Sequence, residues 1–499
     1  MLKELRIQNT LTKKKELFEP VSAPHVGMYA CGPTVYSDVH LGNIRTFLSF
    51  DIVYRYLQHL GYKVRYVRNI TDVGHLVSDA DEGEDKIAKK AKTENIEPMQ
   101  VVQRYTNGFH QVAETMNLLP PDIEPQATGH IIEQIELTQT LLDKGLAYES
   151  EGSVYFDIEK YSELGHSYGI LSGRKVEDLL ETTRELDGQN EKRNKADFAL
   201  WKKASPEHIM RWNSPWSVGF PGWHLECSVM STKYLGDKFD IHGGGMDLKF
   251  PHHECEIAQC VGAHGESPAK YWMHTNMLTV NGTKMSKSKG NSFLPEELFT
   301  GNHPVLDEGY SPMTVRFFML QSHYSSTLDF SNEALKAARK GYRKLANGLR
   351  LAEKLEFVTE EGVELNEKAI KQVEGICDNC YRAMNDDFNT PKTIAHLFNL
   401  LKKINSVDTG QLKPSALGEE TFKRMIDTFL SFSQDVLGFK IEKPDQFDGL
   451  LDIVLKLYKE AKENKEYDKV DEIRGEMKEK GIVIKDMKTR IDWAYDENI

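Results

Sequence analysis

The feature that most constrains the fold is a strand, turn, helix and strand pattern near the start of the chain. Residues 26–31 form a short apolar run, and the apolar side chains after it recur at three- and four-residue intervals until Gly61. Residues 63–71 then alternate apolar and charged side chains, as a strand does. This pattern is typical of half of a nucleotide-binding α/β sheet, whose ligand lies where the turn meets the helix. The turn contains His40-Leu41-Gly42-Asn43.

A second stretch, 284–288, suits the same kind of ligand. Lys284 and Lys287 lie in a short loop between Gly282 and Gly290. Two mobile ammonium groups can follow the charge of a polyphosphate as it moves during a reaction. Either stretch alone could be an ordinary surface turn, so it is their occurrence together that predicts a function.

The length and charge of the chain limit the remaining possibilities. At 499 residues it is too long for one core, so several domains are expected. Because the net charge is −13, a nucleic acid would have to bind to local basic patches. We expect a cytoplasmic protein without a membrane association, since no 18-residue apolar run occurs and residues 2–20 lack the apolar region of a signal peptide. The 6 cysteines are expected to be reduced.

Changes of composition along the chain predict five segments. The two halves of the α/β domain cover 1–119 and 206–329, separated by an insertion at 120–205. From there the chain is rich in alanine, leucine and lysine at helical spacing, which predicts an all-helical domain over 330–440. The tail, 441–499, mixes lysines with acids as a solvated helical face does, and is expected to form a small C-terminal domain.

The second half of the α/β domain carries a glycine-rich turn. Residues 239–242 form a short apolar strand, which runs into Gly243-Gly244-Gly245 with Asp247 just beyond. A triple glycine lets the backbone approach a ligand closely, and a carboxylate beyond it can accept hydrogen bonds from ribose hydroxyls. A flexible turn is the alternative interpretation.

Four side chains from both halves form a candidate metal site. Cys31 ends the first strand, Cys227 lies on a predicted helix, and His252 and Glu256 share one face of the next helix because they are four residues apart. Two thiolates, an imidazole and a carboxylate make a reasonable tetrahedral set for zinc. Buried cysteines are the alternative, because the set lacks the CxxC spacing of a structural zinc site.

One CxxC motif does occur, at Cys377 and Cys380. It falls inside a helical pattern and has no second pair of cysteines to complete a metal site. These two residues are therefore predicted to belong to the core or surface of a helix.

Several motifs together resemble the cysteinyl-tRNA synthetases, a family of class I aminoacyl-tRNA synthetases. The resemblance covers the chain from about residue 5 into the 390s and is specific, because other class I synthetases lack the cysteine, histidine and glutamate set. It rests on YACGPTVY at 29–36 followed by HLGN, RNITD at 68–72, PGWHLECS at 221–228, residues 242–247, FPHHECE at 250–256, KMSKS at 284–288 and DDFNTP at 386–391.

The resemblance implies both a fold and an activity. The fold would be an α/β, Rossmann-like class I synthetase catalytic domain with an inserted connective domain, followed by an all-α helical-bundle domain and a small tRNA-binding domain. The enzyme would be a monomeric cysteine–tRNA ligase that activates L-cysteine with ATP to cysteinyl-adenylate and pyrophosphate, then transfers cysteine to the 3′ end of tRNA(Cys). One Zn²⁺ per chain would bind the substrate thiolate, and Mg²⁺ would accompany ATP. Because a small pocket separates cysteine from serine by only about 1–3 kcal/mol, zinc would supply the discrimination without editing.

The resemblance also implies a role for each site residue. The catalytic residues would be His40, Asn43, Lys284 and Lys287. ATP would be bound by Gly42, Gly244, Gly245, Asp247 and Lys287. The amino-acid pocket would be lined by Gly32, Thr71 and Trp223. The zinc ligands would be Cys31, Cys227, His252 and Glu256.

Three features depart from the family pattern. Asn43 stands where the class usually has histidine, so a role that needs a cationic imidazole is excluded and a donor role remains. Cys255 replaces the usual asparagine and could compete for the metal; its softness favours it, but helix position and the family pattern favour Glu256, which we expect. The segment 74–85 is longer than in the family.

Other functions are less consistent with the sequence. A related ligase that passes cysteine to an amino sugar would lack much of the C-terminal helical region. An inactive zinc and nucleic-acid-binding module would have little reason to keep His40, Lys284 and Lys287, and a helical scaffold would explain only the C-terminal third. In the tail, Arg490 and Trp493 are candidates for reading the anticodon, since arginine can pair with a base and tryptophan can stack on one.

Overall fold

A four-stranded parallel sheet organises the N-terminal part of the computed structural model, which describes residues 4–78, 82–174, 191–285, 290–442, 447–487 and 490–498. Its strand order is β13-β12-β3-β4. The strands are β3 (His25–Ala30), β4 (Lys63–Arg68), β12 (Phe239–Gly245) and β13 (Ala269–Thr275).

The order of the strands reverses between β3 and β12. From β3 the chain passes through α1 (Leu41–His59) to β4 on one side, whereas from β12 it passes through α8 (His252–His264) to β13 on the other. Ligands of open α/β sheets bind outside the carboxyl ends of the strands at such a switch point. Cys31 directly follows β3, and the triple glycine ends the adjacent strand β12. The topology therefore brings these distant motifs together.

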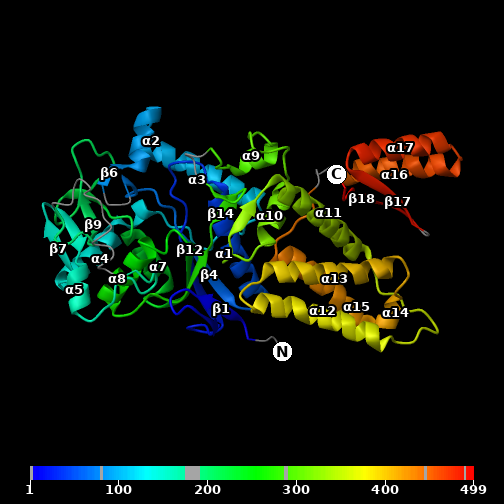
Figure 1. The fold of residues 1–499 in the computed structure, drawn as a ribbon, viewed down its shortest axis with the longest axis horizontal. Helices are drawn as coiled ribbons and strands as arrows, with labels where there is room; N and C mark the ends of the chain where they lie inside the picture. Colours follow the sequence, from blue (N-terminus) through cyan, green and yellow to red (C-terminus); the bar gives the residue numbers. More distant parts are fainter. Residues whose placement is uncertain are drawn as a thin grey trace.

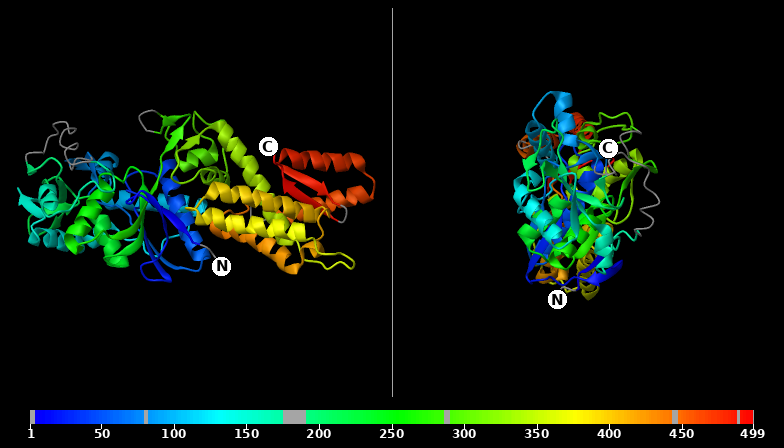
Figure 2. Two further views of the ribbon diagram at one scale, coloured as in Figure 1. Left: turned by 60° about the horizontal axis from the view of Figure 1, so that its bottom comes forward. Right: turned by 90° about the vertical axis from the view of Figure 1, so that its left-hand side faces the viewer.

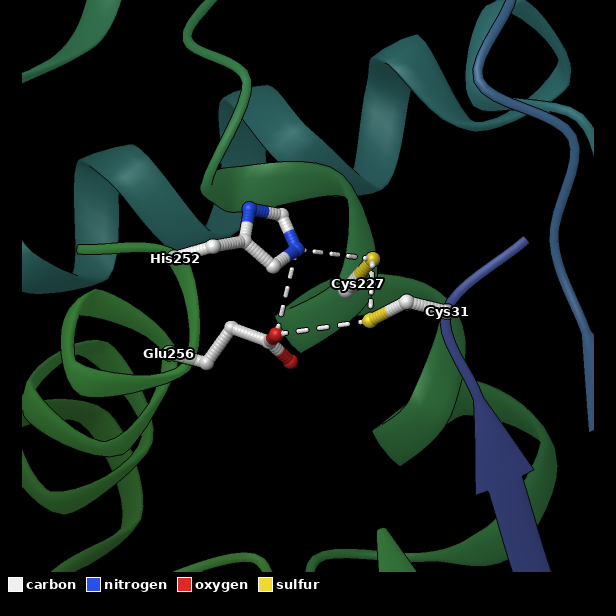
Figure 3. Close-up of side chains that lie close together, drawn as sticks. All are labelled: Cys31, Cys227, His252 and Glu256. Carbon is white, nitrogen blue, oxygen red and sulfur yellow. Dashed lines mark hydrogen bonds and ion pairs between the residues drawn. The ribbon is translucent and has the colours of Figure 1, made fainter. Parts of the chain in front are cut away.

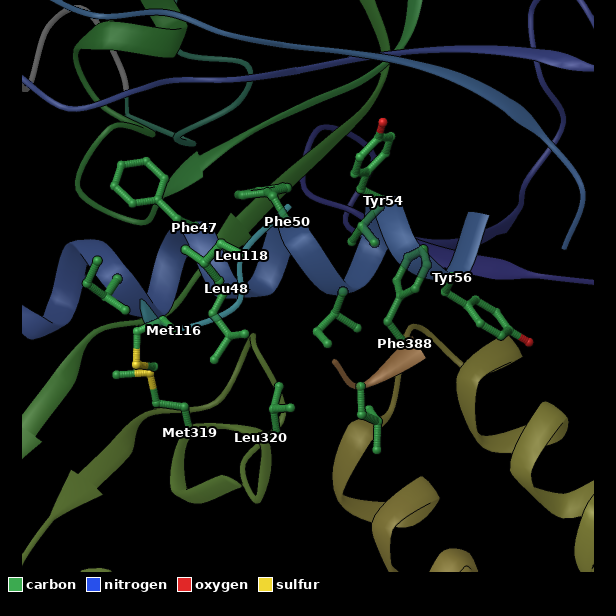
Figure 4. Packing of buried hydrophobic residues seen from close by; sticks show 14 of the residues in the cluster. Phe47, Leu48, Phe50, Tyr54, Tyr56, Met116, Leu118, Met319, Leu320 and Phe388 are labelled. Carbon is green, nitrogen blue, oxygen red and sulfur yellow. The ribbon is translucent and has the colours of Figure 1, made fainter. Parts of the chain in front are cut away.

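Helix α1 is buried on most of its surface and forms the centre of the main core. Figure 4 shows its apolar side chains between the sheet and residues from the middle of the chain, with Phe388 of the helical region packed against its C-terminal half. The helix lies so close to β12 that a Cβ on Gly243 would come within 2.0 Å of the Phe50 ring. Absence of a side chain at Gly243 therefore sets the spacing between the helix and the sheet.

The insertion folds around its own antiparallel sheet, with strand order β10-β11-β9-β8-β7 and a separate apolar core. A hairpin joins β7 to β8, and its turn residues Glu151 and Gly152 both have positive φ. The sheet runs on to Pro221, beyond the expected boundary at 205, because β11 pairs with β9. Its elements are η1 (Ala127–His130), α4 (Ile131–Asp143), β7 (Ala147–Ser150), β8 (Ser153–Phe156), α5 (Ile158–Glu163), β9 (Phe198–Lys203), β10 (Trp212–Asn213) and β11 (Val218–Pro221).

Shorter elements surround the parallel sheet. They are β1 (Arg6–Asn9), β2 (Lys14–Leu17), β5 (Leu76–Ser78), β6 (Glu82–Asp85), α2 (Lys86–Glu94), α3 (Pro98–Thr115), α7 (Leu225–Leu235), β14 (Leu278–Val280), β15 (Thr283–Lys284), α9 (Pro295–Thr300), α10 (Pro312–Leu320) and β16 (Leu328–Phe330). Strands β15, β14 and β16 form a small sheet that leads into the lysine loop.

The rest of the chain is helical except for a terminal hairpin. The helical region contains α11 (Asn332–Lys354), α12 (Glu367–Asn385), α13 (Thr390–Asp408), α14 (Pro414–Leu417), α15 (Glu419–Ser431) and a π turn, η4 (Phe432–Val436). The tail contains α16 (Phe447–Glu463), α17 (Tyr467–Glu479), β17 (Ile482–Asp486) and β18 (Ile491–Tyr495). The hairpin is a feature that the sequence analysis did not predict.

The molecule is elongated, with the inserted sheet and the C-terminal helices at opposite ends (Figures 1 and 2). Within the described ranges, no helix combines the length and apolar character that crossing a bilayer requires.

Candidate active site and metal centre

A cleft of about 410 Å³ opens at the switch point of the parallel sheet. This volume is in the range of small-molecule sites. Segments far apart in the sequence form its walls, including the end of β3, the start of α1 and the starts of α7 and α8. The sequence-predicted residues that line it are Cys31, Gly32, His40, Asn43, Thr71, Trp223, Cys227, Gly245, Asp247 and His252.

The four predicted metal ligands converge at the base of this cleft (Figure 3). All four are buried. The Sγ atoms of Cys31 and Cys227 lie 3.7 Å apart. His252 Nε2 lies 3.3 Å from Cys227 Sγ and 3.2 Å from Glu256 Oε1, and Cys31 Sγ lies 3.9 Å from the same carboxylate oxygen.

These separations fit a four-coordinate metal. Two thiolates about 2.3 Å from a tetrahedral zinc would lie ~3.8 Å apart, and an imidazole nitrogen and a carboxylate oxygen on the same ion would be ~3.3 Å apart. The observed separations are 3.7 Å between the sulfurs and 3.2 Å between His252 and Glu256. The four donor atoms are therefore close enough together to hold one metal ion.

A second possible donor group shares two of these residues. His253 Nε2 lies 3.2 Å from Cys31 Sγ, and His242 Nε2 lies 2.8 Å from Glu256 Oε2, so these residues could also hold a metal. Neither histidine lines the cleft, whereas Cys31, Cys227 and His252 do. Three members of the first group line the cleft and only Cys31 of the second does, so the first group is better placed to present a metal there and the two additional histidines to orient its ligands.

Burial keeps the two thiols and the His252 imidazole uncharged when no cation is present. It raises the pKa of Cys31 to about 12 and the pKa of Cys227 well above its ordinary value, and it lowers the pKa of His252 well below 6.5. A divalent cation would reverse the effect on the thiols, because it stabilises thiolates directly. Two thiolates buried side by side are unfavourable unless a cation balances their charge, which is consistent with a metal site here.

Cys255 does not compete with Glu256 for this position. Its Sγ lies 3.3 Å from the hydroxyl oxygen of Tyr168, in the core of the inserted sheet. The neighbouring side chains of α8 thus point to two different places, Glu256 to the cleft base and Cys255 to the insertion.

The signature turn caps α1 and directs its N-terminus at the cleft. The His40 backbone N–H donates to Asn43 Oδ1 at 3.1 Å, and the Asn43 backbone N–H donates to His40 Nδ1 at 3.3 Å. Since Nδ1 accepts, a neutral His40 carries its proton on Nε2 and can donate it. No acidic residue occupies the first turn of this helix, so its positive end remains suited to a phosphate.

The cap also shows what Asn43 can do in place of the usual histidine. Its side-chain oxygen is used in the cap, while its amide nitrogen can still donate to a ligand. Gly42 supports the arrangement, because a Cβ there would lie 3.0 Å from the His40 ring.

Only some of the remaining residues predicted to bind ATP line the cleft. Gly245 and Asp247 line the cleft, whereas Gly244 lies behind it, where a Cβ would meet His253 at 2.9 Å. Lys284 is exposed on β15 and does not line the cleft. Lys287 lies outside the described residues.

The predicted amino-acid wall includes a carboxyl group that the sequence analysis did not single out. The Thr71 hydroxyl donates to Glu226 Oε1, and Glu226 Oε2 has no hydrogen-bond partner among the described residues. Burial raises the pKa of Glu226 well above its ordinary value. Its position in the sequence could have indicated it, since Glu226 precedes Cys227 within the motif PGWHLECS at 221–228.

The aromatic part of the same wall contains a second residue that was not predicted. The ring of Trp223 stacks on His75 with centroids 4.1 Å apart and an interplanar angle of 7°. His75 lies just before β5 and lines the cleft.

The two candidate anticodon residues in the tail are engaged within the protein. Trp493 is 6% exposed, and the Arg350 guanidinium lies 3.3 Å from the centroid of its ring. Arg490 pairs with Asp408 at 2.7 Å and with Asp492 at 3.4 Å. Trp493 is therefore not available to stack on a base in this arrangement.

Comparison with known proteins identifies the family. The family model for the "tRNA synthetases class I (C) catalytic domain" matches residues 17–340, and the model for the "DALR domain" matches residues 379–442. The cysteine–tRNA ligase of Cytophaga hutchinsonii is 60% identical over 494 residues, covering 99% of each chain. That of Bacteroides thetaiotaomicron is 56% identical over 99% of each chain, and that of Deinococcus radiodurans is 47% identical over 98% of this chain and 96% of its own.

Solved structures share the fold at low identity. Methionyl-tRNA synthetase of Mycobacterium tuberculosis, in complex with methionyl-adenylate, has a TM-score of 0.58 and 16% identity, covering 86% of this chain and 94% of its own. The predicted fold class and the resemblance to class I synthetases are confirmed. The chain belongs to the cysteine–tRNA ligase family of class I tRNA synthetases.

Proposed function

We propose that the protein attaches L-cysteine to tRNA(Cys) in two steps at the cleft of the parallel sheet, as a cytoplasmic monomer. The observation that carries the proposal is that one cleft combines the N-terminus of α1 with the cluster of Cys31, Cys227, His252 and Glu256. A phosphate site and a thiol-selective site in one cleft suit the joining of cysteine to ATP. The names of the relatives support the same activity.

In the first step, a carboxylate oxygen of cysteine attacks the α-phosphorus of ATP and the bond to the β-phosphate breaks. The products are cysteinyl-adenylate and pyrophosphate. His40 donates from Nε2 to the α-phosphate at the end of α1, and Asn43 donates beside it. Lys284 and Lys287 neutralise the departing pyrophosphate, with Mg²⁺ bound to ATP. Such phosphoryl transfer depends on positioning and charge neutralisation more than on a protein nucleophile.

Nucleotide and amino acid would meet at the centre of the cleft. Asp247 accepts from the ribose hydroxyls, and the bare backbone of Gly245 approaches the adenosine, with Gly244 behind it. On the opposite wall, Gly32, Thr71 and Trp223 enclose the amino acid. Glu226 is suited to accept its ammonium group, because Oε2 has no other partner among the described residues.

Selection of cysteine would depend on the four buried donors. When Zn²⁺ is bound there, it supplies a Lewis acid that favours the substrate thiolate over the hydroxyl of serine. Cys31, Cys227, His252 and Glu256 hold the site, and His242 and His253 orient Glu256 and Cys31 through their contacts of 2.8 Å and 3.2 Å.

In the second step, a terminal ribose hydroxyl of tRNA attacks the adenylate carbonyl and AMP leaves. The elongated shape supports contact with two distant parts of a tRNA (Figure 2). A groove between α11 and the terminal hairpin is lined by basic side chains that could meet the phosphates near the anticodon. They are Lys344 and Lys485; the other basic side chains of the groove, Arg350, Lys354 and Arg490, pair with Asp408 or Asp492.

Cysteine-dependent exchange of pyrophosphate into ATP tests the first step. We expect exchange with cysteine, none with serine, and loss of exchange after removal of zinc by a chelator. Exchange with serine at a similar rate would contradict selection by the metal. Absence of any exchange with zinc and magnesium present would contradict the proposed function.

Charging of tRNA(Cys) tests the second step separately. The alternative acceptor, an amino sugar, shares the exchange reaction but not the charging of tRNA. Retention of the helical region and the DALR match at 379–442 favour tRNA. Cysteine exchange without tRNA charging would favour the alternative.

A further inference from the structure

Hydrogen bonds hold the backbone on either side of His75 against the start of α2. Gly74 has φ +80°, and its N–H donates to Asp85 Oδ2 at 2.9 Å. Oδ1 of the same carboxyl group accepts from the first free N–H groups of α2, and the Lys86 N–H donates to the His75 carbonyl at 3.0 Å. A side chain on Gly74 would lie 2.6 Å from the carbonyl oxygen of Pro221. His75 is therefore held in a fixed position beside the strand that precedes Trp223.

Both ring nitrogens of His75 are engaged within the protein. Nε2 lies 2.6 Å from Lys86 Nζ, and Nδ1 lies 3.0 Å from Thr34 Oγ1. An ammonium group can only donate, so Nε2 accepts and Nδ1–H donates to the Thr34 hydroxyl. The nitrogens are thus occupied, and what the ring offers to the cleft is its aromatic face.

That face continues a row of three rings. His75 stacks on Trp223 at 4.1 Å and 7°, and Trp223 lies against His252 with centroids 4.6 Å apart at 37°. All three residues line the cleft. Trp223 is only half-buried, and its indole ring contacts both His75 and His252.

We propose that His75 is a positioning residue for the amino-acid pocket, held in place by the backbone contacts of its neighbours Gly74 and Lys86. By stacking on Trp223, His75 fixes the pocket wall next to the metal ligand His252. The inference rests on the proposed function, because it assigns Trp223 to the cysteine pocket. A fixed wall matters for a small substrate, since a displacement of about 1 Å loosens a pocket that has few contacts to lose.

Three variants of the full-length protein test the stack. His75→Ala removes it, His75→Phe restores an aromatic face without the hydrogen bonds, and His208→Ala is the matched control. His208 stacks on Phe220 at 4.2 Å and 5°, nearly the same geometry, but neither residue lines the cleft. For His75→Ala we expect the KM for cysteine in pyrophosphate exchange to rise about fivefold, with kcat within about twofold, as loss of one aromatic pair predicts.

His75→Phe is expected to restore KM to within about twofold of the wild type, and His208→Ala to leave it unchanged. An unchanged KM in His75→Ala, an equal rise in His208→Ala, or rescue by His75→Gln but not by His75→Phe would overturn the inference.

Tryptophan fluorescence reports on the stack independently of activity. The contribution of Trp223 is obtained as the difference between each protein and the same protein carrying Trp223→Phe. We expect this contribution to shift to longer wavelength in His75→Ala and not in His75→Phe or His208→Ala, because the uncovered indole face meets water. No shift in His75→Ala would count against the stack. Fluorescence tests the stack and exchange tests the function, so the two can fail separately. A wild type that showed the stack but no cysteine-dependent exchange would contradict the proposed function only.

Discussion

Two pairs of buried cysteines differ in their surroundings, in the opposite sense to what their spacing in the sequence suggests. Cys377 and Cys380 have the spacing of a metal motif, yet both are 0% exposed on α12 among apolar side chains of the helical region. Cys31 and Cys227 are 196 residues apart, yet their sulfurs lie 3.7 Å from each other and beside His252 and Glu256.

The neighbours of each pair explain the difference. Cys377 Sγ is directed at the Arg424 carbonyl oxygen, 3.8 Å away, and no cluster of metal-donor side chains in the described parts of the chain includes Cys377 or Cys380. Both cysteines belong to the apolar core of the helical region, as small buried residues do. Cys31 and Cys227 are surrounded by nitrogen and oxygen donors. Burial is common to both pairs, so the surrounding donors, not burial or spacing, distinguish a candidate metal site from a core.

The largest contrast is expected when the same substitution is made in each pair. In Cys227→Ser, zinc affinity should fall by more than about a thousandfold, because a hydroxyl replaces one of two thiolates, and discrimination against serine should fall with it. Elemental analysis after dialysis and pyrophosphate exchange with both amino acids measure the two effects. Cys377→Ser is the control and should keep one zinc per chain. Equal zinc content in the two variants would contradict the ligand assignment.

The pH dependence of zinc binding provides a second contrast. Burial raises the pKa of Cys31 to about 12 and that of Cys227 well above its ordinary value, so both thiols are protonated between pH 7 and 9 in the absence of metal. His252 is already neutral there, since burial lowers its pKa. Binding should release about two protons, so zinc affinity should rise with pH by about a hundredfold per unit.

Competition with a coloured chelator, corrected for the chelator's own protons, measures this slope. It should fall to about one proton in Cys227→Ser and remain at about two in Cys377→Ser. A slope near zero in the wild type would show that no thiol is deprotonated on binding.

A smaller effect is expected at Cys255, which lies next to Glu256 but faces Tyr168. Cys255→Ala should leave zinc affinity within about twofold and should cost about 2 kcal/mol of stability, because the buried tyrosine hydroxyl loses a partner. Zinc titration and urea denaturation separate the two effects. Loss of zinc from this variant would mean that the cysteine, not the glutamate, is the ligand.

The smallest effect is expected from Cys377→Ala. The side chain acts as a small apolar group in the helical core, so the variant should lose about 1 kcal/mol of stability and retain both zinc and exchange activity. Calorimetry should show the change in the transition of the helical region. A change in zinc content would indicate that this pair binds metal after all.

Local patterns account for much of what the sequence predicted correctly. The helices α11, α12, α13 and α15 follow from apolar periodicity, and His252 and Glu256 share a face because they are four residues apart on α8. The end of the inserted sheet was harder to predict. Strand β10 contains 2 residues, too short for any periodic signal, and β11 is recognisable only by its pairing with β9.

The sequence by itself determined the family, the signature turn at the start of α1 and the identity of four candidate ligands, because these depend on residue types and short spacings. Tertiary structure alone decided that β3 lies beside β12, so that Cys31 meets Cys227, that Cys255 points away, and that His75 covers Trp223. Such contacts join segments across long stretches of chain. They form only when the collective burial of a core exceeds the entropy lost in closing the loops between them, a balance that no short window of sequence contains.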